Sequence, residues 1–151
     1  MLEPAIKRTV AYVDGQNLFH AAREAFGYRE PNYDVIALAR EVCRQQGWAL
    51  TETRFYTGIH TPTGNAHWHA YWSAKLAVMG RQGVTVYARR LRYRNRQVRL
   101  PDGTAAVFPY AIEKGIDVRL AIDVIRMGTK NEYDVALVFS QDQDLSEAAA
   151  D

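Results

Sequence analysis

The stretch "YDVALVFSQDQDLS" (residues 133–146) decides the fold of this chain. Its first half is apolar and rich in β-branched residues, which predicts a buried strand, and two acids, Asp142 and Asp144, follow at once. A second predicted strand, "RTVAYVD" (residues 8–14), also ends on an acid, Asp14. The ligand crevice of an open parallel sheet lies outside the carboxyl ends of its strands. These acids therefore meet at one edge if the two strands are neighbours.

Helical and extended segments alternate along the rest of the chain. Helices are predicted over 17–26, 33–47, 61–83, 114–128 and from 144 onward, and extended segments over 48–58, 84–94 and 95–110, with a turn at Asp102 and Gly103. The helix over 114–128 is the clearest, with apolar residues on one face at Ile116, Leu120, Val124 and Met127. Asp34 is placed to cap the second helix and Gly47 to end it. Strands that alternate with helices predict a parallel sheet covered on both faces, so we expect a single α/β domain over residues 1–151.

Composition narrows the class of protein. Of the 151 residues, 48% are hydrophobic and 24% are charged, as is usual in soluble domains. There is no run of about 18 apolar residues, and the N-terminus "MLEPAIKRTV" lacks the apolar core of a signal peptide, so we expect a cytoplasmic protein. A single cysteine, Cys43, excludes an intrachain disulfide and a cysteine-rich zinc site.

The acids at the predicted sheet edge favour a bound cation. Two carboxylates 4 Å apart repel each other by about 4 kcal/mol at an effective dielectric near 20, and a cation between them removes that cost. Asp117, in the first turn of the helix over 114–128, can join Asp14, Asp142 and Asp144. Oxygen ligands without cysteine or clustered histidine select Mg²⁺ or Mn²⁺, and nucleases use such ions to hydrolyse phosphodiesters.

Each of these acids also has a purely structural explanation. Asp142 or Asp144 would cap a helix that begins at Leu145, and Asp117 would stabilise the N-terminus of its own helix through the helix dipole. Asp123 lies six residues after Asp117, about 120° away around a helix. We therefore expect it to be a structural acid, or to contact the metal ligands without binding the metal itself.

Three stretches together resemble a known family. "YVDGQNLF", "EKGIDVRLAIDVI" and "YDVALVFSQDQDLSEAA" occur in the order found in NYN domains of the PIN-like nuclease superfamily, and the chain is most similar to the LabA-like bacterial branch. The resemblance implies a Rossmann-like three-layer α/β/α sandwich and a metal-dependent ribonuclease site. The acids of the family fall on Asp14, Asp117, Asp123, Asp142 and Asp144, and its accompanying amide falls on Asn17.

The chain departs from the family pattern in two places. Relatives commonly have "SGDSD" where this chain has "SQDQD", so that Gln141 replaces a glycine and makes the approach to the site bulkier, although both acids remain. Similar domains also continue beyond "SEAA" through the rest of a helix and a further strand. We therefore expect the domain to lack these elements, and we expect the exposed sheet edge to favour a homodimer.

Arginines are concentrated in one part of the chain. Between Arg81 and Arg99 there are seven arginines and no acidic residue. In an extended ribbon, Arg90, Arg92, Arg94 and Arg96 would share one face. Arginine binds phosphate in a bidentate manner and tyrosine can stack on a base, so an RNA-binding surface is predicted on Arg89, Arg90, Arg92, Arg94, Arg96 and Tyr93. The alternative is a solvated ribbon whose charges serve solubility.

These observations predict a cytoplasmic metal-dependent endoribonuclease that uses Mg²⁺ or Mn²⁺ and acts on RNA. A haloacid dehalogenase-type phosphohydrolase also has an acid after its first strand, but it needs a second acid two residues on, where this chain has Gln16. The stronger alternative is a non-catalytic RNA- or protein-binding domain that keeps the fold. Metal-dependent turnover is the property that separates the enzyme from this alternative.

Overall fold

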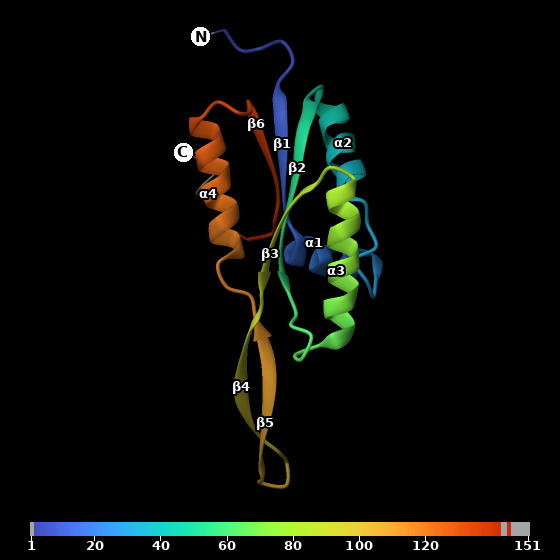
Figure 1. Cartoon of the computed structure of the whole chain (residues 1–151), viewed down its shortest axis with the longest axis vertical. Helices are drawn as coiled ribbons and strands as arrows, with labels where there is room; N and C mark the ends of the chain where they lie inside the picture. The colour runs from blue at the N-terminus through green and yellow to red at the C-terminus, as the bar shows by residue number, and fades with distance from the viewer. Residues whose placement is uncertain (1, 143–144, 146–151) are drawn as a thin grey trace.

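The structure is a computed structural model that describes residues 2–142 and 145. A parallel sheet of four strands, in the order β3-β2-β1-β6, lies at its centre (Figure 1). Its strands are β1 (Arg8–Asp14), β2 (Ala49–Ile59), β3 (Thr85–Arg90) and β6 (Val135–Phe139). The predicted α/β fold with a mostly parallel sheet is confirmed.

Helices cover both faces of this sheet. On one face lie α1 (Gly15–Phe26), α2 (Val35–Gln46) and α3 (Ala66–Arg81), and on the other lies α4 (Ile116–Thr129) (Figure 1). The arrangement is the predicted three-layer α/β/α sandwich.

The alternation of side chains along the central strands builds two hydrophobic cores. Tyr12 and Tyr56 point to the α4 side, whereas their neighbours Val13 and Phe55 pack with α2 and α3. The predicted apolar face of α4 is confirmed, since Ile116, Leu120, Val124 and Met127 are all buried. Every residue of β1 after Arg8 is buried, as expected of a central strand in a parallel sheet.

The second helix begins and ends where the sequence predicts. The Asp34 carboxylate accepts hydrogen bonds from the backbone N–H groups of Ile36 and Ala37 at 2.9 and 3.0 Å. Gly47 ends α2 in the left-handed conformation with φ of 70°, which glycine adopts without steric cost.

The strand order reverses at the end of β1. The chain runs from β1 outward to β2 and β3, and then returns past β1 to form β6 on the other side. Val13 pairs with Phe139, so β1 and β6 are neighbours and their carboxyl ends lie at the same edge of the sheet. In open parallel sheets, ligands bind where the strand order reverses in this way.

A two-stranded ribbon projects from the sandwich (Figure 1). Its strands, β4 (Arg92–Arg99) and β5 (Ala105–Ile112), are antiparallel and joined by the predicted turn at Gly103. The prediction of one strand over 84–94 is wrong at Leu91, where the chain leaves the sheet. The backbone N–H of Leu91 donates to the carbonyl of Ile59, and its side chain packs against Gly58.

No helix within residues 2–142 and 145 has the length and apolar character needed to cross a membrane.

Candidate active site

Asp14 lies at the end of β1 and begins α1. Its side chain is 2% exposed, and it acts as the N-cap of α1. The backbone N–H of Asn17 donates to one carboxylate oxygen at 3.1 Å, and the Asn17 amide donates to the other at 2.6 Å. Asp14 and Asn17 are thus in direct contact, because one turn of helix brings the amide back to the carboxylate. The site roles expected of these two residues stay predictions.

Asp142 follows β6 at the same edge of the sheet. It lies three residues after Phe139, the strand partner of Val13, and its backbone N–H donates to the Ser140 hydroxyl at 3.1 Å. Its carbonyl accepts a hydrogen bond from the backbone N–H of Leu145 at 3.3 Å. Asp144, predicted as its companion ligand, lies outside the described residues.

Glu113 joins this acidic group, although the sequence does not single it out as a site residue. It follows β5 and precedes α4. Burial raises the pKa of Glu113 to about 7, and the negative charge of Asp14 adds to this effect. A hydrogen bond from the backbone of Gly58 lowers the pKa in part, while the charge of Asp117 raises it further. The sequence signals are its position four residues before Asp117 and its place at the start of the stretch "EKGIDVRLAIDVI".

Asp117 lies in the first turn of α4 and is half-buried. The N-cap of α4 is Gly115, which has φ of 81° and supplies no side-chain cap. Asp117 therefore lies where the helix dipole favours an acid, and its charge acts on the Glu113 carboxylate. Folding brings Asp14 into the same electrostatic neighbourhood as Glu113 and Asp117, which lie about 100 residues later in the chain.

A divalent cation suits the chemistry of these residues. Among residues 2–142 and 145, no three Asp, Glu, His or Cys side chains are close enough together to hold a metal ion. One Glu113 carboxylate oxygen, Oε2, is nevertheless buried and has no hydrogen-bond partner in the described part of the chain. A buried acidic oxygen without a partner is costly, and a hard cation would satisfy it. The donors are oxygens, as Mg²⁺ and Mn²⁺ prefer.

Glu113→Gln is expected to stabilise the metal-free protein above pH 7. The pKa of Glu113 is higher in the folded state, at about 7, than the ordinary value of 4.5, so the folded protein binds an extra proton between these values. Stability of the wild type therefore falls as pH rises from about 4.5 to about 7, by about 2 kcal/mol after allowance for solvent screening. Glu113→Gln has no carboxyl group at this position, so its stability should not fall in this way as pH rises.

Thermal unfolding in EDTA at pH 4.5 and pH 8 measures this difference. The variant should melt at a higher temperature than the wild type at pH 8 and at a similar temperature at pH 4.5. Glu24→Gln, at an exposed position on α1, is the matched control and should follow the wild type. Identical pH dependence in wild type and Glu113→Gln would contradict the placement of Glu113 beside other acids.

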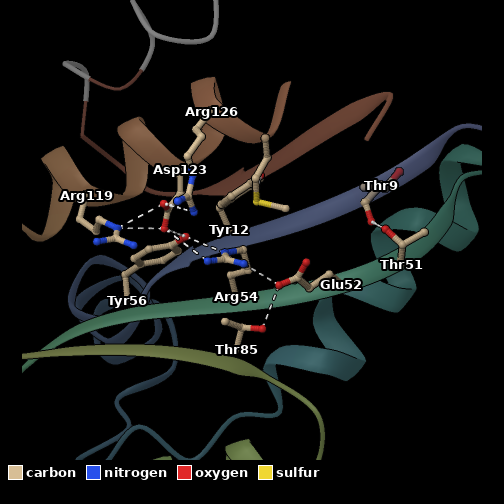
Figure 2. A network of polar contacts seen from close by, with 11 residues as sticks. Thr9, Tyr12, Thr51, Glu52, Arg54, Tyr56, Thr85, Arg119, Asp123 and Arg126 are labelled. Carbon is tan, nitrogen blue, oxygen red and sulfur yellow. Dashed lines mark hydrogen bonds and ion pairs between the residues drawn. The ribbon is translucent and has the colours of Figure 1, made fainter. Parts of the chain in front are cut away.

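Asp123 lies in a separate network on the α4 side of the sheet (Figure 2). It is 1% exposed, and its carboxylate accepts a hydrogen bond from the Tyr56 hydroxyl at 2.9 Å. The same carboxylate forms ion pairs with three arginines, which are Arg54, Arg119 and Arg126. Burial raises the pKa of Asp123, but the Tyr56 hydrogen bond and the arginines outweigh it, so that the net pKa lies below its usual value.

This network joins α4 to β2. Arg54 lies on β2 and also contacts Glu52, which accepts a hydrogen bond from the Thr85 hydroxyl on β3 (Figure 2). Arg119 lies on α4, with its guanidinium 4.8 Å from the centre of the Tyr87 ring. None of these contacts involves the predicted metal ligands. That Asp123 contacts the metal ligands stays a prediction.

The ribbon carries arginines beside aromatic side chains. Residues that pair across an antiparallel ribbon share one face, and Arg94 pairs with Tyr110 while Arg96 pairs with Phe108. Both aromatic side chains are largely exposed. The sequence prediction did not include them, although "VFPY" is an unusually apolar stretch for an exposed strand.

The other predicted RNA-binding residues lie in different surroundings. Arg90 ends β3 in the main sheet, so it does not share a strand with the ribbon arginines as the sequence suggested. The reason is the break at Leu91. Arg89 lies over the start of α4 and donates to the Lys114 carbonyl at 3.4 Å. Tyr93 is half-buried; its hydroxyl is 2.9 Å from His60 Nδ1 and packs against the loop that follows β2.

A parallel sheet with helices on both faces and acids at the carboxyl ends of its strands is the arrangement of a Rossmann-like, PIN-like domain. The family model of the NYN domain matches residues 8–151, and the chain therefore belongs to the NYN-domain family. NYN domains are generally nucleases that act on RNA, usually with divalent metal ions. Neither the curated proteins nor the solved structures include a significant match to this chain. Its place in the LabA-like branch stays a prediction.

Proposed function

We propose that this protein is an endoribonuclease that hydrolyses RNA phosphodiesters with the help of Mg²⁺ or Mn²⁺. The observation that carries the proposal is the partly buried Glu113 carboxylate, which lies near the charges of Asp14 and Asp117 and whose Oε2 is buried and lacks a hydrogen-bond partner in the described residues. A fold that places like charges together in this way is stabilised when a cation binds among them.

The residues divide into those that hold the cation and those that hold the RNA. Asp14, Asp117, Asp142 and Asp144 would bind the ion directly or through water, and Glu113 would add a further carboxylate. When bound, such an ion supplies charge stabilisation at the phosphate and acidifies a bound water. Asn17 donates its amide to Asp14 and so keeps that carboxylate in one orientation, or turns to the scissile phosphate.

The ribbon would position the RNA backbone. Arg92, Arg94 and Arg96 are exposed and alternate along β4, which suits contacts with successive phosphates. Arg89 and Arg90, at the end of β3, would extend this basic surface toward the start of α4. We assign Tyr93 to anchoring the ribbon, because its hydroxyl already contacts His60 and accepts a hydrogen bond from the backbone N–H of Thr61.

Asp142→Asn is the variant that tests the proposal. A labelled single-stranded RNA is incubated with wild type and with Asp142→Asn in Mn²⁺, in Mg²⁺ and in EDTA. Cleavage should require a divalent ion and fall at least about tenfold in the variant, because one negative ligand is lost. Circular dichroism provides the control for folding. Metal-independent cleavage, or undiminished cleavage by Asp142→Asn, would count against the proposal.

A second candidate is an RNA-binding domain without catalysis. It is favoured by the observation that no three potential ligands converge at metal-binding distance among residues 2–142 and 145. Binding of RNA that weakens with salt, without cleavage in any metal ion, would support this second function.

Homodimer formation stays a prediction. Strand β6 lies at the edge of the described sheet, and α4 on its face exposes Val118, Ile122 and Ile125. A second copy of the chain would cover these side chains.

A further inference from the structure

A cavity between α1 and α3 is the strongest unassigned feature of the molecule. It has a volume of about 200 Å³ and opens to solvent. The residues that matter for its chemistry are Phe19, His20, Arg23, Arg29, Gly58 and Trp68. We call it the Trp68 pocket.

The Trp68 pocket lies next to the candidate active site. Gly58 forms part of its wall and also adjoins the acids, since a side-chain carbon at Gly58 would lie 3.1 Å from the unpartnered Glu113 oxygen. Leu91, where the ribbon begins, lines the pocket as well. The pocket is therefore close to both the predicted catalytic acids and the predicted RNA-binding ribbon.

Aromatic surfaces and positive charges occur together in this pocket. The Phe19 and Trp68 rings are 6.1 Å apart with 58° between their planes, and the Arg23 guanidinium is 5.7 Å from the centre of the Phe19 ring. Within the described part of the chain, neither Arg23 nor Arg29 forms an ion pair with an acidic residue. Their charges are thus available to an anion.

The size of the cavity limits what can enter. Its volume of about 200 Å³ is many times the space that one water molecule needs. The pocket is therefore large enough for a single planar base. Bases of single-stranded nucleic acids stack on aromatic side chains, and guanidinium groups bind phosphates in a bidentate manner.

We propose that the Trp68 pocket binds one unpaired nucleotide of the RNA strand beside the phosphodiester to be cleaved. The base stacks on Trp68 with Phe19 at its edge, and Arg23 and Arg29 bind its phosphate. This inference rests on the proposed ribonuclease function and adds to it a preference for single-stranded RNA. The alternative is an aromatic cluster that packs α1 on α3, with two solvated arginines.

The test is a binding experiment in EDTA with the full chain. The probes are AMP, measured by calorimetry, and a labelled single-stranded pentanucleotide and its duplex form, measured by fluorescence anisotropy. Arg23→Gln and Arg29→Gln change exposed side chains and should fold normally. Trp68→Leu removes the stacking surface. Arg40→Gln, on the exposed surface of α2, matches the loss of charge away from the pocket.

Each pocket variant should bind AMP and the pentanucleotide about tenfold more weakly than the wild type, the change expected for the loss of one stacking or phosphate contact. Arg40→Gln should bind as the wild type does, and the duplex should bind more weakly than the single strand. Unchanged affinity in Arg23→Gln and Arg29→Gln overturns the proposal, as does equal binding of single strand and duplex.

Failure of this inference can be told apart from failure of the proposed function. If the wild type binds AMP in the pocket but cleaves no RNA, the nucleotide site stands without the nuclease. If RNA is cleaved with metal while the pocket variants bind normally, the nuclease stands and the pocket assignment is overturned.

Discussion

Asp14→Asn is expected to lower the rate of RNA cleavage about a thousandfold or more and to leave the fold intact. Asp14 is buried at the end of the central strand, near Glu113, at the point where the strand order reverses. A cation at such a site supplies several kcal/mol of charge stabilisation in the transition state, and each 1.36 kcal/mol corresponds to tenfold in rate. Removing a central negative ligand removes most of that effect.

The fold should survive this substitution for two reasons. Asparagine is as good an N-cap as aspartate, so an Asn side chain at this position can still accept the backbone hydrogen bond that Asn17 now donates. The substitution also removes one of the negative charges that raise the pKa of Glu113, so the metal-free variant should melt at the same or a higher temperature. Initial rates of cleavage in Mn²⁺, with thermal melting in EDTA, measure both effects.

Asp34→Asn is the matched control. Asp34 is the N-cap of α2 as Asp14 is the N-cap of α1, but Asp34 is not one of the proposed metal ligands. It should cleave RNA as the wild type does. Equal loss of activity in the two variants would mean that capping, rather than the acidic site, is responsible. Full activity of Asp14→Asn would contradict its assignment as a ligand.

The second large effect is expected on stability. Asp123→Ala should lower the free energy of unfolding by about 3 to 5 kcal/mol, because it leaves buried partners without a carboxylate. The Tyr56 hydroxyl loses its 2.9 Å hydrogen-bond acceptor, and Arg54, with 14% of its side chain exposed, loses one of its two anionic partners. Equilibrium unfolding in urea measures the change through the midpoint at constant slope.

Glu41→Ala gives the comparison with a solvated ion pair. Glu41 pairs with Arg44 on the surface of α2, where both side chains are more than half exposed, and its removal should change stability little. A loss in Asp123→Ala no greater than that in Glu41→Ala would contradict the structural role of the network.

The pH dependence of this network has the opposite sign to that of Glu113. The pKa of Asp123 is lower in the folded state, so its contribution is present above the ordinary carboxyl pKa and is lost as pH falls through the folded value. If Asp123 instead contacts the metal ligands and holds them in position, Asp123→Asn would lower the rate of RNA cleavage at neutral pH and leave the free energy of unfolding unchanged. The same two assays thus decide between these roles.

Several parts of the fold could be predicted from local sequence. The capping side chain of Asp34 and the left-handed Gly47 act within a few residues of themselves, so the limits of α2 follow from its sequence. The buried face of α4 follows from helical spacing in the same way. The break at Leu91 could not be predicted, because it depends on contacts with Gly58 and Ile59 in another strand.

By itself, the sequence determined the α/β class, the order of the elements and the presence of acids after the first and last strands, because periodicity, caps and turns act over short stretches of chain. Only the tertiary structure decided which of these acids lie near one another. Strand order made β1 and β6 neighbours, and the packing of the ribbon and α4 brought Glu113 beside Asp14. The same packing turned Asp123 toward Arg54 and Tyr56 on β2. Electrostatic interactions between residues far apart in the chain exist only once the sheet and helices have assembled.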